Sequence, residues 1–589
     1  MKEKWIVETK RADFGALAAK FGISPVLARI IRNRDVTEEE GFRLFLHGTL
    51  EDLPDARLLK DMDKALAILQ EKIRKKARVR VLGDYDIDGV CSTYILVSAF
   101  QRLGLDCDAD IPDRITDGYG MNPRMIRDAI AAGVDTIVTC DNGISAKEAC
   151  RLAKEAGLTI IVTDHHEVPK DEDGQEILPE ADAVIDPKQK ACQYPFKEIC
   201  GAEVAWKLVG ELYRLEGIGK QEWLSFIEFA ALATVGDVMP LKEENRIIVR
   251  EGLKAMANTK NIGLSCLIEA TGLKPDHLNT YHLGFVIGPC LNAGGRLQNA
   301  KIALALFFTD SRPEAMDLAQ YLRDLNEQRK VMTEDGLKAA IDTIEKEGLD
   351  QDDVLVVWLP ECHESLAGII AGRLRERYNH PAFVLTGTEE MVKGSGRSIP
   401  AYSMFDELCR VSGCLEKFGG HPMAAGLSLK KDNIEAFRSQ LNTFSTLKPD
   451  DFCPEVRIDV PMPIDYITED LIGQFAMLEP CGTGNPRPVF AESHFRILRA
   501  AIIGRNRNVL KMTVVNPTGC RMEAVYFGDI PAFQAFVEKE YGRMEVENMF
   551  RGRENSVDLA FTYYPEINEY NGRRSLQIII SHYCRIKNT

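Results

Sequence analysis

Short, largely apolar runs alternate with helix-like segments along the first half of the chain. Residues 79–82, 136–140 and 159–163 are rich in valine, isoleucine and threonine, and each is as short as a buried strand. Between them, residues 122–132 and 146–156 carry apolar side chains every three or four positions, as amphipathic helices do. Strands that alternate with helices favour a parallel sheet. The pattern therefore predicts an α/β domain.

The remaining pattern divides the chain into further parts. Asp310-Ser311-Arg312-Pro313-Glu314 places a polar cap and a proline where a helix begins, and leucines at helical spacing follow. Residues 354–359 open a second, smaller α/β domain, and short alternating runs such as 495–499 and 576–580 indicate a small barrel. The expected parts are a helical appendage at 1–60, the first α/β domain at 61–250, a helical connector at 251–350, the second α/β domain at 351–447 and the barrel at 455–589.

Each predicted strand of the first domain ends on acidic or imidazole side chains. These are Asp84, Asp86 and Asp88 after the first strand, Asp141 after the second, and Asp164 with two histidines after the third. The carboxyl ends of parallel strands lie at one edge of a sheet, so these groups are expected to meet there. Carboxylates so close repel one another, and some would hold a proton unless a cation lay among them. Taken alone, the first cluster is equally typical of an acidic turn in which Asp88 caps a helix.

The types of side chain restrict the metal. Carboxylates and imidazoles without a nearby thiolate suit manganese or magnesium better than structural zinc, and none of the 15 cysteines forms a Cys-x-x-Cys pair. So many acids are enough for two ions about 3.5–4 Å apart, a spacing at which a metal pair generates hydroxide and stabilises the leaving oxygen of a phosphoester. The predicted metal ligands are Asp84, Asp86, Asp88, Asp141, His165 and Asp237.

Two adjacent histidines allow a division of labour. One imidazole can bind metal while its neighbour, which points elsewhere, donates to a phosphate oxygen or acts on the leaving group. We assign metal binding to His165 and catalysis to His166, and we expect Asp141 to take part in catalysis by bridging the two ions. The predicted reaction class is metal-assisted hydrolysis of a phosphoester.

The order of these motifs is specific. Asp84-Tyr85-Asp86-Ile87-Asp88-Gly89, Asp141-Asn142-Gly143, Asp164-His165-His166 and Asp237 resemble the four ordered motifs of the DHH phosphoesterase superfamily. Further runs at 285–297, 325–330, 394–398, 419–426 and 478–486 resemble those of the RecJ family of single-strand exonucleases. The resemblance extends from about residue 30 to the end of the chain. It implies a parallel-sheet DHH metal domain, a helical connector, a smaller α/β DHH-associated domain and a C-terminal OB-like β-barrel.

The resemblance also implies that the second domain faces the metal domain across a cleft and holds the DNA strand. Gly394-Ser395-Gly396-Arg397-Ser398 is expected to be a loop whose amides and guanidinium bind a phosphate, and Gly419-Gly420-His421 a second such loop. Outside the family, the first run is most often a surface turn. The second is equally typical of a tight turn with a packed histidine, and Arg373 is equally typical of a solvated helix arginine. The implied substrate-binding residues are Asn292, Arg296, Arg373, Ser395, Arg397 and His421.

From the resemblance we expect a metal-dependent exonuclease for single-stranded DNA. It would work 5′ to 3′, hydrolyse phosphodiester bonds to mononucleotides, and act in DNA repair and recombination. A single-strand-binding protein and a RecQ-type helicase are its implied protein partners. Two alternatives stay open. One is a phosphodiesterase for short oligonucleotides or cyclic dinucleotides, whose known forms lack the barrel tail. The other is a non-catalytic replication scaffold, whose known forms have lost the metal ligands that this chain retains.

Composition changes this picture little. The 589-residue chain has a net charge of −16, which disfavours tight binding of long DNA, yet a local basic track is sufficient for a groove. The tail contains such a basic track, because Arg505, Arg507 and Lys511 are interleaved with aromatic residues such as Tyr563 and Tyr570. The N-terminus resembles no signal peptide, and no apolar run reaches membrane-spanning length. Because the odd number of scattered cysteines indicates reduced thiols, we expect a cytoplasmic protein without membrane contact.

Overall fold

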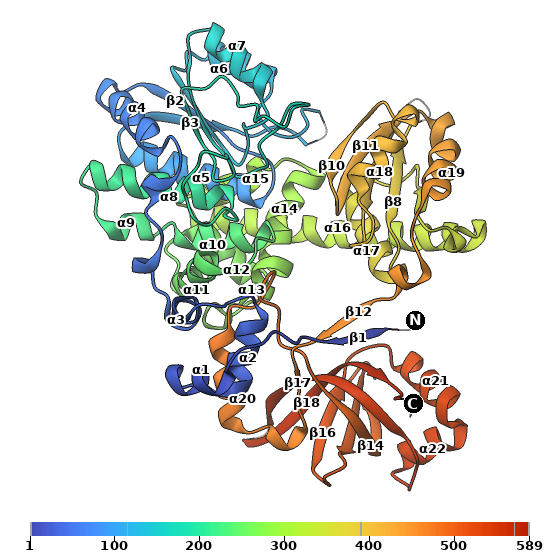
Figure 1. Ribbon diagram of the computed structural model, residues 1–589. Helices are drawn as coiled ribbons and strands as arrows, with labels where there is room; N and C mark the ends of the chain where they lie inside the picture. Colours follow the sequence, from blue (N-terminus) through green and yellow to red (C-terminus); the bar gives the residue numbers. More distant parts are fainter. Residues whose placement is uncertain (1–2, 115, 389–390, 571, 587–589) are drawn as a thin grey trace. The chain divides into compact units, whose positions relative to one another are not determined.

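The chain folds into two compact units (Figure 1). The computed structural model describes residues 3–114, 116–388, 391–570 and 572–586, with the backbone alone at Tyr570. The first unit runs from Leu50 to Pro454, and the second joins the N-terminal residues up to Thr49 to those from Glu455 onward. Within the described residues no single helix is long and apolar enough to cross a membrane; Phe14–Phe21 and Pro25–Asn33 meet that criterion only as a pair bent by 108°.

A five-stranded parallel sheet forms the framework of the first unit. Its strands are β2 (Arg78–Leu82), β3 (Asp106–Asp110), β4 (Thr136–Cys140), β5 (Thr159–Thr163) and β6 (Ala183–Ile185), and its helices are α4 (Met62–Lys75), α5 (Ile87–Arg102), α6 (Pro123–Ala131), α7 (Lys147–Glu155), α8 (Gly201–Leu215), α9 (Lys220–Leu224), α10 (Ile227–Gly236) and α11 (Glu243–Met256). The strand order is β3-β2-β4-β5-β6, with every neighbouring pair parallel. Val79 and Val81 pack in the core that includes α5 and α8, whereas Leu82 packs with α6 and α7. The predicted strands and helices of this domain are confirmed.

A helical region follows the sheet. It contains α12 (Ile262–Ala270), α13 (Thr280–His282), a π-helical turn (Leu283–Ile287), α14 (Gly288–Leu297), α15 (Lys301–Phe308) and the long α16 (Arg312–Glu347). The hydroxyl of Ser311 accepts the N–H of Glu314 and caps α16, with proline in its first turn. Leu322 and Leu325 are buried. The predicted start and apolar stripe of this helix are therefore confirmed.

The rest of the first unit is a second, mixed sheet with helices on it. Its elements are β7 (Leu355–Trp358), α17 (Ala367–Tyr378), β8 (Ala382–Gly387), β9 (Val392–Arg397), α18 (Met404–Arg410), β10 (Lys417–His421), β11 (Ala424–Leu429) and α19 (Ile434–Phe444). The strand order is β10-β11-β9-β8-β7, in which only β7 and β8 run parallel. Separate hydrophobic clusters cover its two faces.

The two glycine-rich runs of this domain are strands, which corrects the expectation that they are loops. Gly394 and Gly396 lie within β9, between β8 and β11, and Gly420 lies within β10. A Cβ on Gly394 would come within 2.5 Å of the Leu385 side chain, and one on Gly396 would come equally close to the Phe383 ring. These two glycines therefore make room for large side chains of the neighbouring strand, and both are paired in the ladders of β9 with β8 and β11.

The second unit is built around a closed barrel. Its elements are β1 (Lys4–Val7), α1 (Phe14–Phe21), α2 (Pro25–Asn33), α3 (Glu39–His47), β12 (Glu455–Ile458), β13 (Val460–Pro461), α20 (Glu469–Phe475), β14 (Phe490–Ile503), β15 (Val509–Val515), β16 (Arg521–Tyr526), α21 (Ile530–Tyr541), α22 (Arg543–Arg551), β17 (Asp558–Tyr570) and β18 (Arg573–Cys584). The strands run β14-β15-β16-β18-β17, and β17 also pairs with β14. The predicted barrel is confirmed.

The N-terminal segment is part of the same unit as the barrel. Strand β1 pairs in parallel with β12. The guanidinium of Arg34 donates to both carboxylate oxygens of Asp459, at 2.7 and 3.1 Å, and both side chains are buried. Because a buried pair that loses one partner leaves an uncompensated charge, this contact ties the two chain ends together. The domain limits expected from the sequence stay predictions.

Candidate metal centre and anion pocket

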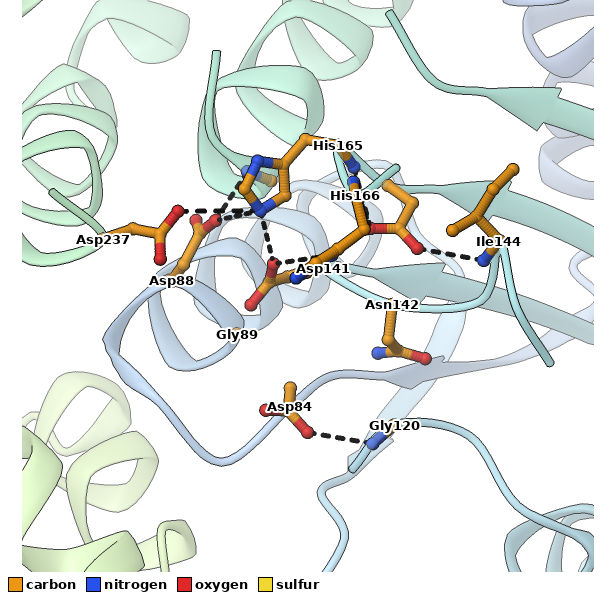
Figure 2. Close-up of polar contacts among 12 residues, drawn as sticks. Asp84, Asp88, Gly89, Gly120, Asp141, Asn142, Ile144, His165, His166 and Asp237 are labelled. Carbon is orange, nitrogen blue, oxygen red and sulfur yellow. Dashed lines mark hydrogen bonds and ion pairs between the residues drawn. The ribbon is translucent and has the colours of Figure 1, made fainter. Parts of the chain in front are cut away.

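The acidic and imidazole motifs converge at the carboxyl edge of the parallel sheet. The first cluster joins β2 to α5, Asp141 follows β4, and the two histidines follow β5. Asp237 arrives from elsewhere, as the residue that ends α10. Figure 2 shows the imidazole of His165 between the carboxylates of Asp88, Asp141 and Asp237. Four of the predicted ligands, Asp88, Asp141, His165 and Asp237, are thus brought together from separate segments, whereas Asp84 and Asp86 do not join these groups.

His165 lies at the centre of this cluster. Its Nε2 is 3.1 Å from Asp141 Oδ1, 3.5 Å from Asp88 Oδ2 and 3.7 Å from Asp237 Oδ2. Neither ring nitrogen has a hydrogen-bond partner among the described residues. Burial, and then the charge of His166, lowers the pKa of His165 to about 3. The ring is therefore neutral at physiological pH, which is the form that binds metal.

The carboxylates of the aspartate motifs repel one another, and those of Asp84, Asp88 and Asp141 are buried, whereas Asp237 is half-buried. One oxygen each of Asp84 and Asp141 is buried without a hydrogen-bond partner in the described part of the chain. Burial, followed by the charges of neighbouring aspartates, raises the pKa of Asp84, Asp141 and Asp237 well above the usual range. Orphaned acceptors beside an unprotonated imidazole are the environment that a divalent cation relieves. The residues present therefore fit a divalent-metal site.

Asp86 and Asp88 have different roles in the backbone. Asp86 caps α5, because its Oδ1 accepts the N–H groups of Asp88 and Gly89 at 3.0 and 3.1 Å. Asp88 instead accepts the N–H groups of Gly201 and Ala202, both at 2.6 Å, from the start of α8. Burial, and then Asp86, raises the pKa of Asp88 to about 6. The helix cap that the sequence suggested for Asp88 is therefore Asp86, and Asp88 faces His165.

Gly201 was not identified from the sequence, although it brings α8 into contact with the centre. A Cβ on Gly201 would lie 2.7 Å from the Cβ of Asp141. Only glycine lets the first turn of α8 approach Asp141 while its amides hold Asp88. The amides at a helix start also favour a negative charge, so they stabilise the ionised form of Asp88.

His166 faces a different set of groups from His165. Its Nδ1 donates to Asp164 Oδ1 at 2.8 Å, and its Nε2 lies 3.0 Å from the hydroxyl of Tyr119. Burial opposes a charge on this ring, but the hydrogen bond and charge of Asp164, with Asp237 and Asp86, raise its pKa to about 9. The Tyr119 hydroxyl donates to the backbone oxygen of Asp141 at 2.7 Å. His166 is therefore a positioned cation. Tyr119 lies in a loop without a recognisable motif, so no sequence signal marked it.

Three guanidinium groups surround a pocket next to the metal cluster. The pocket has a volume of about 320 Å³, and Arg114, Arg296 and Arg397 line it together with Ser395 and Tyr85, the residue between Asp84 and Asp86. Arg296 donates to the backbone oxygen of Ser365 and Arg397 to the backbone oxygen of Gly396, each at 2.8 Å. No ion pair joins any of the three guanidiniums to a carboxylate within the described residues.

Burial and mutual repulsion act on these arginines. Burial, and then the charge of Arg114, lowers the pKa of Arg296 to about 10, and the same two effects lower the pKa of Arg397. Arg114 lies 4.7 Å from the centre of the Tyr85 ring. Half-buried guanidiniums that lie together and form no ion pair with a carboxylate are suited to bind an anion. Arg114, like Tyr119, was not predicted from the sequence.

The structure does not gather every predicted substrate residue in this pocket. Arg373 is exposed on α17, where it pairs with Glu376 at 3.4 Å, and His421 is exposed on β10. Neither lines the pocket. Asn292 lies on α14, and its Oδ1 is buried without a hydrogen-bond partner among the described residues. The assignments of Arg373, His421 and Asn292 stay predictions.

The basic and aromatic residues expected in the barrel are divided between surface and core. Arg505 and Arg507 are exposed, whereas Lys511 pairs with Glu523 at 3.2 Å. The ring of Tyr563 is buried and its hydroxyl donates to the Met462 oxygen, so this tyrosine belongs to the core. The side chain of Tyr570 lies outside the described residues.

Comparison with known proteins identifies the family. Family models match residues 78–236 (DHH family, N-terminal domain), 351–446 (DHHA1 domain) and 458–582 (RecJ OB domain). The chain is 34% identical over 587 residues to the single-stranded-DNA-specific exonuclease RecJ of Bacillus subtilis, covering 98% of this chain and 70% of that protein. It is 33% identical over 584 residues to the Escherichia coli RecJ, covering 95% and 96%. The chain belongs to the RecJ family. The resemblance predicted from the motifs is confirmed.

Solved structures of RecJ share the fold of nearly all of this chain. The Thermus thermophilus RecJ in complex with Mn²⁺ superposes with a TM-score of 0.82 at 26% identity, covering 99% of this chain and 80% of that one. The Mg²⁺ complex of the same protein gives a TM-score of 0.75 at 25% identity, with coverages of 99% and 79%. The predicted fold class, with its DHH, DHH-associated and OB domains, is therefore confirmed.

Proposed function

We propose that this chain is a metal-dependent exonuclease for single-stranded DNA, as the names of its RecJ relatives describe. The observation that carries the proposal is the position of the metal cluster directly beside a pocket of three guanidiniums, since Tyr85 contributes to the pocket from within the first aspartate run. A terminal phosphate held in that pocket brings the next phosphodiester to the carboxylates. One nucleotide is then released in each cycle.

The ions would be Mn²⁺ or Mg²⁺, as in the two Thermus thermophilus structures. The residues that would hold a pair of them are Asp84, Asp86, Asp88, Asp141, His165 and Asp237, with Asp141 as the bridging group. When bound, such ions supply an activated water and positive charge for the leaving oxygen. The proposal is supported by the neutral His165 and by the orphaned oxygens of Asp84 and Asp141.

His166 stabilises charge that develops on the phosphate. Asp164 holds its Nδ1–H, so the remaining N–H, at Nε2, is directed at the Tyr119 hydroxyl, 3.0 Å away. A pKa of about 9 keeps this proton in place at neutral pH. A charged donor that is already oriented costs no reorganisation during the reaction. We therefore assign to His166 a charge-assisted hydrogen bond to a non-bridging phosphate oxygen.

The direction of hydrolysis follows from which end the pocket accepts. A terminal phosphate carries up to about two negative charges and an internal phosphodiester only one, so three unpaired guanidiniums favour a phosphorylated end. We propose that this is the 5′ end and that the products are mononucleotides. A 5′-phosphorylated strand is then expected to have a lower KM than the same strand with a 5′-hydroxyl, and Arg397→Ala is expected to remove that difference.

The decisive experiment is digestion of end-labelled single strands with Mn²⁺ or Mg²⁺. The proposal predicts early release of a 5′ label as mononucleotide, late release of a 3′ label, and little attack on a blunt duplex of the same sequence. Release of the 3′ label first would overturn the polarity. Hydrolysis of dinucleotides or cyclic dinucleotides with no attack on long strands would favour the phosphodiesterase alternative, and no hydrolysis with bound metal would favour the scaffold.

We further propose a place for this activity in the cytoplasm, in DNA repair and recombination. A single-strand-binding protein would present the strand, and a RecQ-type helicase would unwind the duplex that the enzyme cannot attack. Affinity purification of the full chain from its own host, with nuclease added to remove DNA bridging, tests these partners. Recovery of neither protein would contradict the proposal.

A further inference from the structure

A second cavity lies in the first unit, apart from the metal centre and the anion pocket. It has a volume of about 1000 Å³, and none of the predicted metal ligands or guanidiniums of the anion pocket lines it. Its walls come from α5, α10, the end of α11, the start of α12 and the end of α15. This volume is large enough for a mononucleotide-sized ligand.

A buried carboxyl group faces this cavity. Glu228 is only 4% exposed, yet it is one of the lining residues. Its Oε1 accepts the hydroxyl of Thr259 at 2.7 Å, and its Oε2 has no hydrogen-bond partner within the described residues. Burial raises the pKa of Glu228 to about 7, against the effect of the Thr259 hydrogen bond. A ligand that offers N–H donors would satisfy this group.

The other walls of the cavity carry aromatic rings and a cation. The ring of Tyr94 packs against Phe229 at 4.4 Å and Phe308 at 5.1 Å between ring centres, and all three rings line the cavity. Asn261 donates to the Tyr94 hydroxyl at 3.0 Å, which fixes the ring. Lys260 is exposed at the cavity and forms no ion pair among the described residues. The cavity therefore combines an aromatic wall, an acceptor and a cation, which suit a nucleotide's base and phosphate.

Two helices connect this cavity to the metal centre. Helix α5 begins at the aspartate run, and its later residues Tyr94 and Arg102 line the cavity. Helix α10 runs the other way, since Glu228 lies in its first turn and Asp237 ends it. At 1.5 Å of rise per residue, these two carboxyls are about 14 Å apart along the helix axis. A ligand that shifts either helix would move a metal ligand.

We propose that this cavity is a regulatory binding site for a guanine mononucleotide. A carboxylate only accepts hydrogen bonds, and guanine is the DNA base whose pairing edge presents two adjacent N–H donors, N1–H and N2–H. Adenine and cytosine place an acceptor beside their amino group, and thymine has a single N–H between two acceptors. The regulatory role rests on the proposed function, because hydrolysis of DNA would produce dGMP; binding itself does not depend on it.

Calorimetric titration of dGMP into the full chain in EDTA tests the site without any nuclease reaction. We expect one saturable site in the wild type that is selective for guanine, with at least about tenfold weaker binding of dAMP, dCMP and dTMP at that site, and at least about tenfold loss for dGMP in Glu228→Gln. Because a mononucleotide can also enter the anion pocket, Arg397→Ala is the matched control and should bind dGMP normally. No binding at about 1 mM dGMP, or equal binding by Glu228→Gln, would overturn the site.

A second measurement tests the coupling. The Mn²⁺ concentration that gives half-maximal hydrolysis of a single strand should change when dGMP saturates the wild type, and should stay constant in Glu228→Gln. An unchanged Mn²⁺ requirement in the wild type at saturating dGMP would overturn the regulatory role. Failure of the enzyme to hydrolyse single strands at all would instead contradict the proposed function, and the titration in EDTA would still report on the site.

Discussion

The Nδ1 of His166 donates to Oδ1 of Asp164 at 2.8 Å, and the same carboxylate accepts the backbone N–H of Ile144 through its other oxygen at 2.9 Å. Asp164 is thus held in place by the backbone and in turn holds the imidazole. The cluster uses two adjacent histidines in opposite states: His165 is neutral and central, and His166 is charged and peripheral. This difference leads to the first two predictions.

Replacing Asp164 with Asn should slow the reaction without weakening substrate binding. The pKa of His166 would fall from about 9 toward its ordinary value near 6.5, so its charge would be lost at neutral pH. In the wild type the rate should fall as pH rises through about 9, and in Asp164→Asn it should fall at lower pH. We expect kcat at pH 8 to drop by about 100-fold with little change in KM. Asp182→Asn is the matched control, because the Asp182 carboxylate also accepts a backbone N–H, that of Ile160 at 2.8 Å, but its other partner is Lys154 instead of an imidazole. An unshifted pH profile in Asp164→Asn would contradict the role of Asp164.

The two histidines should separate in metal binding. His165→Ala removes a central ligand, so its affinity for Mn²⁺ should fall by at least about tenfold in calorimetric titration. His166→Ala should bind Mn²⁺ with nearly wild-type affinity and turn over slowly, because it lacks only the charge-assisted hydrogen bond. Equal losses of Mn²⁺ affinity in both variants would refute the division of labour.

The second unit should provide affinity for long strands rather than the chemistry. Because the N-terminal segment folds with the barrel, the test compares the full chain with a fragment of residues 50–454 instead of a simple C-terminal deletion. The fragment should retain kcat/KM on a roughly 5-nucleotide strand and lose it on a roughly 40-nucleotide strand, at about 1–3 kcal/mol per stacked base. Binding by the full chain should also weaken with added salt. An equal proportional loss of kcat/KM on both strand lengths would show that this unit stabilises the fold and does not bind the strand.

Glu228 should make the first unit less stable as pH rises. Its folded pKa of about 7 lies above its ordinary value of 4.5, so the unfolded chain releases this proton first. The free energy of unfolding should therefore fall between about pH 4.5 and 7, by up to about 3 kcal/mol from this group. Glu228→Gln should lack that loss and be more stable than the wild type at pH 7.5, but not at pH 4. Denaturant unfolding at both pH values measures the free energy of unfolding of each protein. The same difference between Glu228→Gln and the wild type at pH 4 and at pH 7.5 would contradict the prediction.

Much of the first domain could be predicted because its signals are local. Strands such as Thr136–Cys140 are short β-branched runs, and the acids at their ends meet because parallel strands bring those ends together. Arg114 and Tyr119 could not be predicted, since their loop has no apolar period and its position depends on contacts across the sheet edge. The pairing of Arg34 with Asp459 joins residues 425 positions apart, so no local pattern indicates it.

The glycine-rich runs show a different reason for error. Glycine is most often used for turns, so the local sequence predicts a loop at Gly394 and Gly396. In the folded chain their lack of a side chain leaves space for Leu385 and Phe383 of the next strand. Which of the two uses applies depends on the neighbouring strand, and the local sequence does not contain that information. The helix cap at Asp86 is similar, because either Asp86 or Asp88 satisfies the local rule.

The proposed hydrolysis of single-stranded DNA depends on ions held by the carboxylate and imidazole cluster. Asp141 has a backbone φ of 60°, a conformation that asparagine tolerates better than alanine, so Asp141→Asn tests the carboxylate charge with the least disturbance of the fold. The most direct measurement is the rate of mononucleotide release from a single strand by the wild type and Asp141→Asn at saturating Mn²⁺. We predict wild-type hydrolysis that EDTA abolishes and Mn²⁺ restores, and less than about a tenth of that rate in a folded Asp141→Asn. Hydrolysis that survives EDTA, or an Asp141→Asn variant as active as the wild type, would contradict the account.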